Sequence, residues 1–221
     1  GLTTAQDVLK YHKILKGYNQ KNDLKLEFLP IVMVNEHTPP DEIKKCVDHG
    51  IMDCKVYPLN RTTKSHNGVR NYATIIELMR RCRNFGVKWH FHPEHPSPIF
   101  SSRDAEFAFL PIVDMMLQDS ESIVVWEHGT DSRCIPHWEE MAKSERFYVT
   151  LTAHHLASDE DVEFGDVRSV CKPPIKTQQD RVGLVGLVEK DYDWVMAGPD
   201  DAPHDKKAKH PETGCCACGA Y

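Results

Sequence analysis

Single polar residues stand at the ends of apolar, strand-like segments of this sequence. Lys55 lies within DCKVYP, His92 ends VKWHFH and His128 ends IVVWEH, while His155 ends YVTLTAHH and Asp200 follows WVMAGP. Ligands of parallel α/β sheets bind at the carboxyl ends of the strands, where residues from distant parts of the chain can meet. Histidines together with a carboxylate at such a position are typical of a catalytic metal that keeps one coordination position open.

Each of these residues also has an ordinary structural interpretation. A single histidine at a strand end is more often hydrogen-bonded than metal-bound, and a lysine there is usually solvated. Asp200 follows a proline in a turn-like sequence. The long spacing of the set differs from the paired ligands of a zinc finger. The set as a whole, rather than any one member, predicts a metal-dependent hydrolase on an α/β scaffold.

Strand-like and helix-like segments alternate along the chain, which predicts an α/β fold with a parallel sheet. The roughly seven strand candidates come close to the eight of a (β/α)8 TIM-type barrel. An open, doubly wound sheet would give the same local pattern, although no GxGxxG follows the first strand. One domain over residues 1–221 is the economical interpretation. The strand candidates are 26–34, 52–57, 87–92, 123–128, 148–155 and 194–198, with an irregular or extended segment at 167–175. The helix candidates are a segment that begins after the capping-box pattern Thr4-x-x-Asp7, and 40–49, 71–84, 104–117, 136–143 and 178–189.

The composition excludes several classes of protein. The chain has 221 residues, of which 40% are hydrophobic and 27% charged, as in ordinary globular proteins. A net charge of -6 argues against nucleic acid as the main partner. The longest apolar run, residues 28–34, is too short to span a bilayer, and the polar start of the chain resembles no secretory signal. Many of the eight cysteines lie in core-like segments, which favours a reducing, cytoplasmic location.

Five stretches of the sequence carry a family likeness. They are CKVYPLNRTTKSHNGV, GVKWHFHPEH, VVWEHGTD, VTLTAHHL and AGPDDAPHDKKAKHPETGCCACGAY. Through them the sequence resembles the dihydroorotases of the single-function type, in the amidohydrolase superfamily, along nearly its whole length. The pairing of K-x-Y-P-x-N-x-T-T with D-x-A-P-H and a following Cys/Gly/Ala cluster is specific to that family. The resemblance implies a TIM-type barrel and a cytoplasmic enzyme that interconverts carbamoyl aspartate and dihydroorotate in pyrimidine biosynthesis.

The resemblance implies a binuclear zinc site. Lys55 matches the lysine that becomes carboxylated and bridges the two ions, and His92 and His128 match the ligands of the more exposed ion. Asp200 matches the ligand of the buried ion, which is also the general acid and base. Two zinc ions lower the pKa of a bridging water, so that hydroxide exists near neutral pH and can attack the amide carbon. Asp200 would take the proton and pass it to the leaving nitrogen.

Other residues match substrate contacts of the family. His204 matches a residue that binds the substrate carboxylate, and Thr62 and Thr63 match a loop that closes over the substrate. Residues 217–220 lie near a further substrate contact whose register stays open. Of the adjacent pair His154 and His155, strand alternation lets only one face inward, and His155 is favoured as a group behind the metal ligands.

Two acidic residues and a cysteine cluster have simpler interpretations. Glu94 and Glu127, beside the predicted metal ligands, are expected to orient them or to be solvated. Cys215, Cys216 and Cys218 could form a small metal site, but a turn packed under the substrate loop is favoured because no partner CxxC exists.

The sequence also departs from the family. The H-x-H-x-R motif of the family's first strand and a later substrate-binding Asn have no counterpart, since His90-Phe91-His92 belongs to another strand. The likeness also stops before the family's last helices, so we expect a barrel that is incomplete at its first strand, with exposed sheet edges. Such a chain should bind at most one zinc ion well and turn over slowly or not at all.

Two alternatives to a dihydroorotase stay open at this point. One is a catalytically inactive, dihydroorotase-like fragment or scaffold that pairs with other subunits. The other is a hydantoinase-like hydrolase, which the Thr-Thr loop and the DAPH segment disfavour. A homodimer and a small-molecule substrate are expected from the family, with neither nucleic acid nor a membrane as partner.

Overall fold

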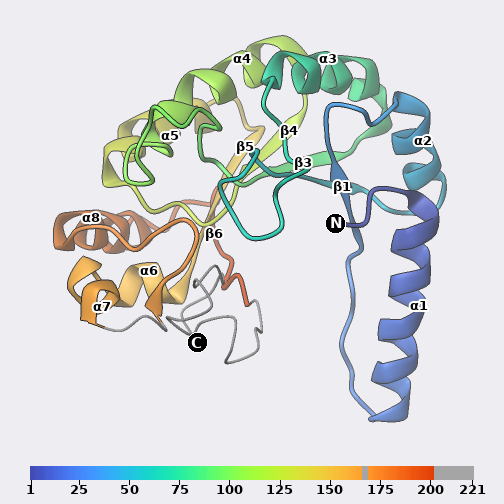
Figure 1. The fold of residues 1–221 in the computed structure, drawn as a ribbon, viewed down its shortest axis with the longest axis horizontal. Coiled ribbons are helices and arrows are strands. Elements are labelled where there is room, and N and C mark those ends of the chain that lie inside the picture. Colours follow the sequence, from blue (N-terminus) through green and yellow to red (C-terminus); the bar gives the residue numbers. More distant parts are fainter. Residues whose placement is uncertain (166–168, 202–221) are drawn as a thin grey trace.

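A sheet of six strands organises the chain in a computed structural model that describes residues 1–165 and 169–201 (Figure 1). The strands are β1 (Ile31–Val34), β2 (Asp53–Val56), β3 (Lys88–Phe91), β4 (Ile123–Trp126), β5 (Phe147–Leu151) and β6 (Val195–Ala197). The helices are α1 (Ala5–Lys21), α2 (Pro40–Asp48), α3 (Tyr72–Cys82), α4 (Leu110–Ser120), α5 (Ile135–Ala142), α6 (Ala153–Ala157), α7 (Glu160–Gly165) and α8 (Gln178–Val188), with 3-10 helices at Arg83–Phe85, Phe107–Phe109 and Ser132–Cys134.

All neighbouring strands pair in parallel, and their spatial order β1-β2-β3-β4-β5-β6 follows the chain. This winding in one direction is that of a (β/α)8 barrel, whereas a doubly wound sheet reverses its strand order. Among the described residues the sheet does not close on itself. The outer edge of β1 is covered in part, because the Met33 amide donates to the Leu2 carbonyl at 2.8 Å.

The two faces of the sheet have different chemistry. The row Cys54, Trp89, Val124 and Phe147 is fully or almost fully buried and faces the helices. The next row along the strands begins with Lys55, which lies opposite His90. Because successive side chains point to opposite faces, this second row faces the inside of the curved sheet, and its polar residues are gathered there.

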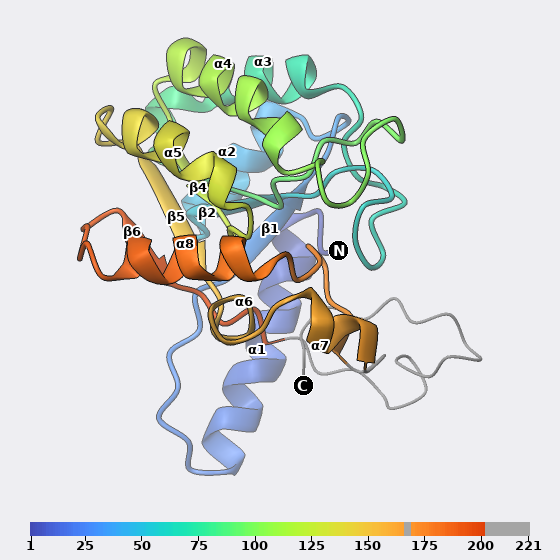
Figure 2. The ribbon, with the colours of Figure 1, turned by 90° about the vertical axis from the view of Figure 1, so that its left-hand side faces the viewer.

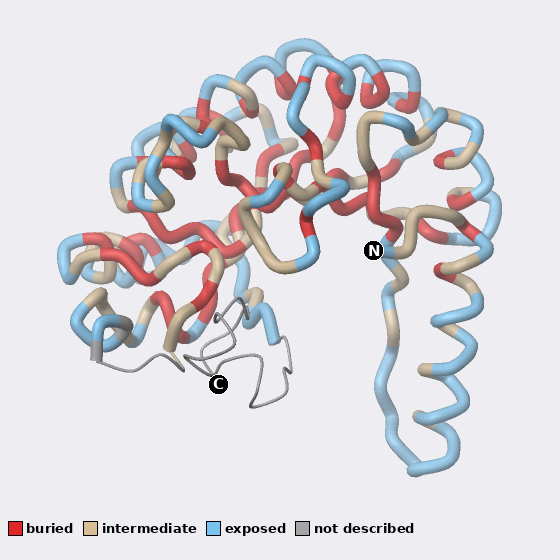
Figure 3. The backbone as a smooth tube through the Cα atoms, viewed as in Figure 1, coloured by how far each residue is buried: buried red, intermediate tan, exposed pale blue. Residues whose placement is uncertain are grey.

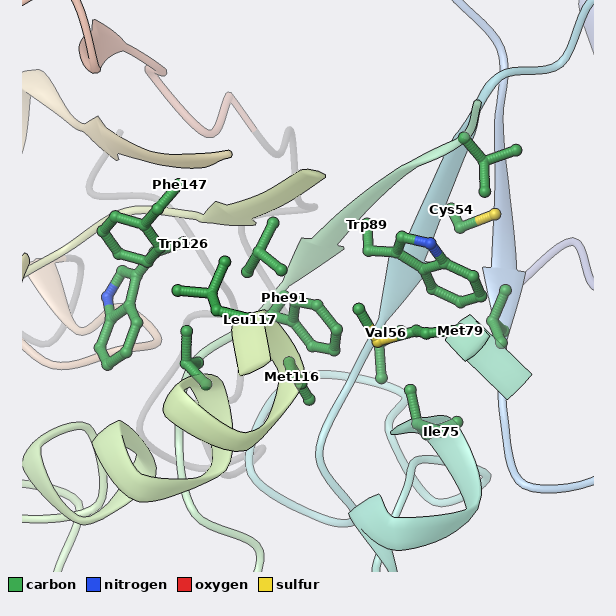
Figure 4. Packing of buried hydrophobic residues seen from close by; sticks show 14 of the residues in the cluster. Cys54, Val56, Ile75, Met79, Trp89, Phe91, Met116, Leu117, Trp126 and Phe147 are labelled. Carbon is green, nitrogen blue, oxygen red and sulfur yellow. The ribbon is translucent and has the colours of Figure 1, made fainter. Parts of the chain in front are cut away.

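The core lies between the sheet and the arc of helices outside it, as the burial colours of Figure 3 indicate. Figure 4 shows strand aromatics packed against α3 and α4; the labelled side chains include Trp89, Phe91, Trp126, Ile75, Met79, Met116 and Leu117. The apolar residues of α3 recur at helical spacing, so one face of this helix is buried against the sheet. By contrast, α1 projects away from the sheet in Figure 1 and buries only Ala5 and Val8.

Local signals in the sequence explain where several elements begin and end. The Thr4 side chain caps α1 by accepting from the Asp7 amide, and Pro40 starts α2 at a position where proline is favoured. Thr177 and Asp180 form a capping box at the start of α8. Gly86 ends the turn after α3 with φ of 69°, a backbone conformation that glycine adopts without strain.

Several expected boundaries are wrong. The predicted strand 26–34 begins only at Ile31, and the predicted strand 148–155 ends at Leu151, so that His154 and His155 lie in α6. Strand alternation therefore does not apply to this pair. Both side chains are buried, because consecutive side chains at the start of a helix can both point inward. The helix predicted at 104–117 begins only at Leu110, after a 3-10 turn. The described part of 167–175 contains no named strand.

Candidate active site

Four of the predicted site residues meet at the carboxyl ends of the strands. Lys55 lies in β2, His92 directly follows β3, His128 follows β4 and Asp200 follows β6. Burial, followed by the charges of His92 and Lys55, lowers the pKa of His128 far below its ordinary value, and Lys55 and His92 also act on the pKa of Asp200. Lys55 and Asp200, which are 145 positions apart in the sequence, are thus close enough in the fold for the charge of one to act on the pKa of the other.

His92 and His128 form the buried centre of this cluster. Their ring centroids lie 4.6 Å apart in an edge-to-face arrangement, and the two residues are 2% and 3% exposed. Nε2 of His92 lies 2.6 Å from Oε2 of the fully buried Glu94, which leaves Nδ1 as the ring nitrogen that could bind a metal. A carboxylate behind a histidine fixes the tautomer and orientation of metal-binding imidazoles, so Glu94 has the orienting contact expected of it.

Lys55 is held between a carboxylate and an aromatic ring. Its ammonium forms an ion pair with Glu127 and lies 4.9 Å from the centre of the Tyr57 ring. Glu127 also approaches Nδ1 of His90 at 3.2 Å, and Nε2 of His90 lies 2.9 Å from the Asp53 carboxylate. Glu127 is therefore an ion-pair partner of a site residue rather than a solvated carboxylate.

Sequence reasoning missed the polar chain below Lys55. Asp53, Lys88 and His90 occupy inward-facing positions of β2 and β3, where barrels usually place branched apolar residues. Lys88 pairs with Asp53 at 3.2 Å. The sequence spacing could have revealed this polar chain. Asp53 and Lys55 are two positions apart, as are Lys88 and His90, and residues two apart in a strand share a face.

The backbone is strained where two of the site residues follow their strands. His128 has φ of 41° and Asp200 has φ of 53°, a region that residues other than glycine rarely adopt. The His128 amide is tied down by donating to Oγ1 of Thr150, at 2.8 Å. Strain of this kind persists where the surrounding structure over-determines a conformation, and it clusters at functional sites.

The pKa of the Asp200 carboxyl is raised above its ordinary value. Burial is the largest cause and disfavours the charged form, while the positive charges of Lys55 and His92 partly oppose it. A carboxyl group tuned toward neutrality in this way exchanges a proton more readily at neutral pH than an ordinary aspartate.

Thr62 and Thr63 lie in a structured loop between β2 and α3. Pro58 and Val69 form a parallel bridge at its base, and within it the Thr62 amide donates to Oγ of Ser65 at 3.1 Å. Arg61 ties the loop to the segment after β3, since its Nε donates to the His95 carbonyl at 2.7 Å. The loop is thus joined to the segment that carries His92 and Glu94.

The donor set fits a metal of the zinc type. Nδ1 of His128 is buried without a hydrogen-bond partner among the described residues, and so is Oε1 of Glu94. Buried polar atoms are rarely left unsatisfied unless a bound group or a function explains them. His128, whose lowered pKa keeps it neutral, supplies an imidazole in the form that binds metals.

His155 lies beside this cluster rather than in it. Its Nδ1 is 2.7 Å from Oγ1 of Thr152 and its Nε2 is 3.1 Å from the Pro173 carbonyl. Burial, and then the charge of His154, lowers the pKa of His155 well below its ordinary value. The remaining predicted positions, His204, residues 217–220 and the three tail cysteines at 215, 216 and 218, lie outside the described residues.

Known proteins resemble this chain in fold and in sequence. No family model matches the chain. The dihydroorotase of Acidovorax sp. (strain JS42) is 28% identical over 98% of the chain and 63% of its own length. The dihydroorotase of Saccharomyces cerevisiae is 29% identical over 100% of the chain and 64% of its own length. The chain therefore spans less than two thirds of the length of these relatives.

Solved structures also resemble this chain in fold. Dihydroorotase from Saccharomyces cerevisiae, in complex with 5-fluoroorotic acid, superposes with a TM-score of 0.89 and 27% identity over 99% of this chain and 63% of that one. L-Hydantoinase (dihydropyrimidinase) from Arthrobacter aurescens gives a TM-score of 0.81 at 13% identity, over 98% of this chain and 52% of that one, which is a likeness of fold.

The fold is therefore the parallel α/β fold of the TIM-barrel hydrolases that include dihydroorotases and hydantoinases, here with six strands and no closure among the described residues. Within that class, the chain is homologous to dihydroorotases along nearly its whole length. None of the helices in the described part of the chain is long and apolar enough to cross a bilayer.

Proposed function

We propose that this chain carries the metal site of a zinc-dependent cyclic amide hydrolase, a dihydroorotase that interconverts carbamoyl aspartate and dihydroorotate in pyrimidine biosynthesis. The observation that carries the proposal is the meeting of Lys55, His92, His128 and Asp200 at the strand ends. Their order along the chain and their motifs are those of the resemblance to dihydroorotases, and relatives of that name match nearly the whole chain.

In this proposal each residue has a stated part in holding zinc. His92 would bind through Nδ1, with Glu94 behind it, and His128 would bind as a neutral imidazole. Lys55, once carboxylated, would offer a carbamate oxygen, and Asp200 would complete the set. Bound zinc would polarise the amide carbonyl and make water acidic enough to react near neutral pH.

The proton is handled by this chain's own residues. Asp200 accepts a proton from the attacking water and donates it to the ring nitrogen as the amide bond breaks, and ring closure runs through the same group in reverse. Its raised pKa brings the carboxyl closer to the pH at which it must both accept and donate. Thr62 and Thr63 contact the substrate from the loop above, and His204 pairs with the substrate carboxylate.

We further propose that this chain forms one partial barrel domain over residues 1–221 and binds no more than one zinc ion tightly. The four proposed ligands are too few to enclose two ions, and the sequence contains no His-x-His-x-Arg motif. The protein would act in the cytoplasm, where its buried thiols stay reduced, and a homodimer is the expected assembly.

Metal content and turnover test the proposed function. The purified chain should hold at most one zinc ion by atomic emission and hydrolyse dihydroorotate slowly, with no cleavage of hydantoin. Lys55→Ala should lower both zinc content and turnover, whereas Lys45→Ala, on the exposed surface of α2, should change neither.

Three outcomes would count against parts of the proposal. Two tightly held zinc ions with rapid turnover would refute the single-ion site. Faster cleavage of hydantoin than of dihydroorotate would favour a hydantoinase-like enzyme. Absence of both zinc binding and turnover would favour an inactive scaffold.

A further inference from the structure

Three buried side chains with metal-binding atoms meet at α6, the helix that follows β5. They are separate from Lys55, His92, His128 and Asp200, which we call the strand-end cluster. His154 and His155 lie in α6, and Cys171 lies in the segment that leads into α8. Figure 2 shows α6 next to α8. One ligand atom from each lies within 4.8 Å of the other two, and the three residues are at most 5% exposed. Two imidazoles and a thiol form a donor set that suits borderline and soft cations.

The spacing of two of these atoms is that of ligands around one tetrahedral cation. Sγ of Cys171 lies 3.6 Å from Nε2 of His155. With metal–sulfur and metal–nitrogen bonds of about 2.3 and 2.0 Å at a tetrahedral angle, the two ligand atoms would lie roughly 3.5 Å apart, close to the separation in this structure. The pair could therefore bind a cation with little change in its separation.

His155 is held in the orientation that such a site needs. Oγ1 of Thr152, the N-cap of α6, lies 2.7 Å from Nδ1 and fixes one side of the ring. This contact directs Nε2 toward Cys171 and the Pro173 carbonyl. Metal-binding histidines ordinarily have their second nitrogen fixed by such a hydrogen bond.

Both ligand atoms carry protons in this structure, and both form hydrogen bonds with one carbonyl oxygen. Nε2 of His155 and the Cys171 thiol both donate to the Pro173 carbonyl, at 3.1 and 3.2 Å. On binding, the thiol proton would leave to solvent as the metal–sulfur bond forms. The imidazole proton would pass from Nε2 to Nδ1, and the Thr152 hydroxyl would change from donor to acceptor. One proton would be released for each cation, and the Pro173 oxygen would be available as a fourth ligand.

We propose that His154, His155 and Cys171 form a separate site for a thiophilic divalent cation, Zn²⁺ or Cd²⁺. The proposal is independent of the hydrolase activity, because the two ring nitrogens of His155 engage Thr152, Cys171 and Pro173 and not the strand-end cluster. A cation there would tie α6 to the segment that precedes α8.

Cadmium binding to the full chain tests the site, with Cd²⁺ alone as the probe. A cadmium thiolate absorbs in the ultraviolet through charge transfer, and the strand-end cluster contains no thiol. We expect one equivalent of Cd²⁺ to give this band. Cys171→Ser should abolish it, and His154→Gln should weaken binding by about 10- to 100-fold, the loss usual when a metal site is disturbed.

Two cysteine controls separate this site from other thiols. Cys134→Ser removes a buried core thiol whose pKa burial raises, and it should leave the band unchanged. A variant with serine at Cys215, Cys216 and Cys218 should also keep it. A band that survives Cys171→Ser, or disappears with the three tail substitutions, would overturn the proposal.

A second measurement does not depend on the folding of any variant. The ¹¹³Cd NMR shift of the unmodified chain should report one sulfur and two nitrogens around the cation. A spectrum with signals typical of oxygen and nitrogen ligands, or of several thiolates, and with no signal for a mixed sulfur–nitrogen site would refute the proposal.

Discussion

At the scale of single residues, the candidate active site depends on which partner holds each metal-binding side chain. His92 lies 2.6 Å from a fully buried carboxylate, Glu94, and His128 faces the same site with a buried Nδ1 that has no hydrogen-bond partner in the described part of the chain. The arrangement resembles the carboxylate–histidine–metal triads in which the second partner sets the basicity and angle of the ligand. The two histidines are thus prepared differently, one by a hydrogen bond and the other by burial.

Removing the Glu94 charge should weaken zinc binding. Glu94→Gln keeps the shape but replaces the acceptor that orients His92, so we expect zinc affinity to fall by about 10- to 100-fold. Competition with a chromophoric chelator measures the affinity. Glu145→Gln, on the loop before β5 and away from the site, is the control. An unchanged affinity in Glu94→Gln would mean that Glu94 does not orient a ligand.

At the scale of elements, the loops after the strands are fixed by contacts with later helices. The Asp180 carboxylate at the start of α8 accepts from the Ser132 amide at 2.9 Å and from its hydroxyl at 2.8 Å. It also accepts from the Thr177 amide within its own capping box. One side chain therefore caps α8 and attaches this helix to the segment that follows His128.

The stability that Asp180 contributes should depend on pH. Burial alone would raise its pKa, but the hydrogen bonds from Thr177 and Ser132 outweigh burial and lower it. A lowered pKa means stability that is present above the unfolded value of about 3.9 and is lost as the pH falls through the folded value.

Asp180→Ala should therefore lower the free energy of unfolding at pH 7 by about 1.5 to 3 kcal/mol, the range for hydrogen bonds to a charged group. The difference from the unsubstituted chain should shrink below about pH 4. Urea unfolding at several pH values measures it, with Asp161→Ala in α7 as the exposed control. A difference that persists unchanged in acid would contradict the assigned pKa direction.

At the scale of the whole molecule, a buried ion network joins distant parts of the chain. Lys176, which is 4% exposed, lies 2.6 Å from Glu106 and 3.5 Å from Asp131, two residues that are fully buried. Glu106 also accepts from the Thr130 amide and from the Trp126 indole. Burial acts to lower the pKa of Lys176, but the charges of Glu106 and Asp131 outweigh burial and raise it. Its contribution to stability is therefore fully present below the unfolded pKa of about 10.4 and is lost as the pH rises through the higher folded pKa.

Removing this lysine should destabilise the fold strongly. Lys176→Met leaves the buried Glu106 carboxylate without its cation, whereas Asp131 keeps its ion pair with Arg133 at 2.7 Å. The uncompensated charge should cost about 3 to 5 kcal/mol in the free energy of unfolding. Denaturant unfolding measures the loss. Adding Glu106→Gln to Lys176→Met should restore part of it, since one uncompensated charge is removed. Lys44→Met, in an exposed pair with Asp48, should have little effect. If Lys176→Met and Lys44→Met lowered the free energy of unfolding by similar amounts, burial would not be what sets the loss of stability.

Local apolar periodicity and motifs, which can be counted along the chain, predicted the order of the strands and of the longer helices and the parallel sheet. They also predicted the strand-end positions of Lys55, His92, His128 and Asp200. The short helices α6 and α7 were not predicted. The ends of elements were less certain, as for the strand that stops at Leu151, because tertiary contacts decide the last turns. The roles of the site residues and of the substrate loop stay predictions.

The contacts between side chains of different strands and helices could not be read from the sequence. The polar chain of Asp53, Lys88 and His90, the network around Lys176 and the meeting of Cys171 with α6 join residues between 16 and 70 positions apart. Such pairs depend on strand register and on the packing of helices against the sheet. Strand register and helix packing are set by the burial of the whole core, and a local pattern of residues does not determine how distant segments pack there.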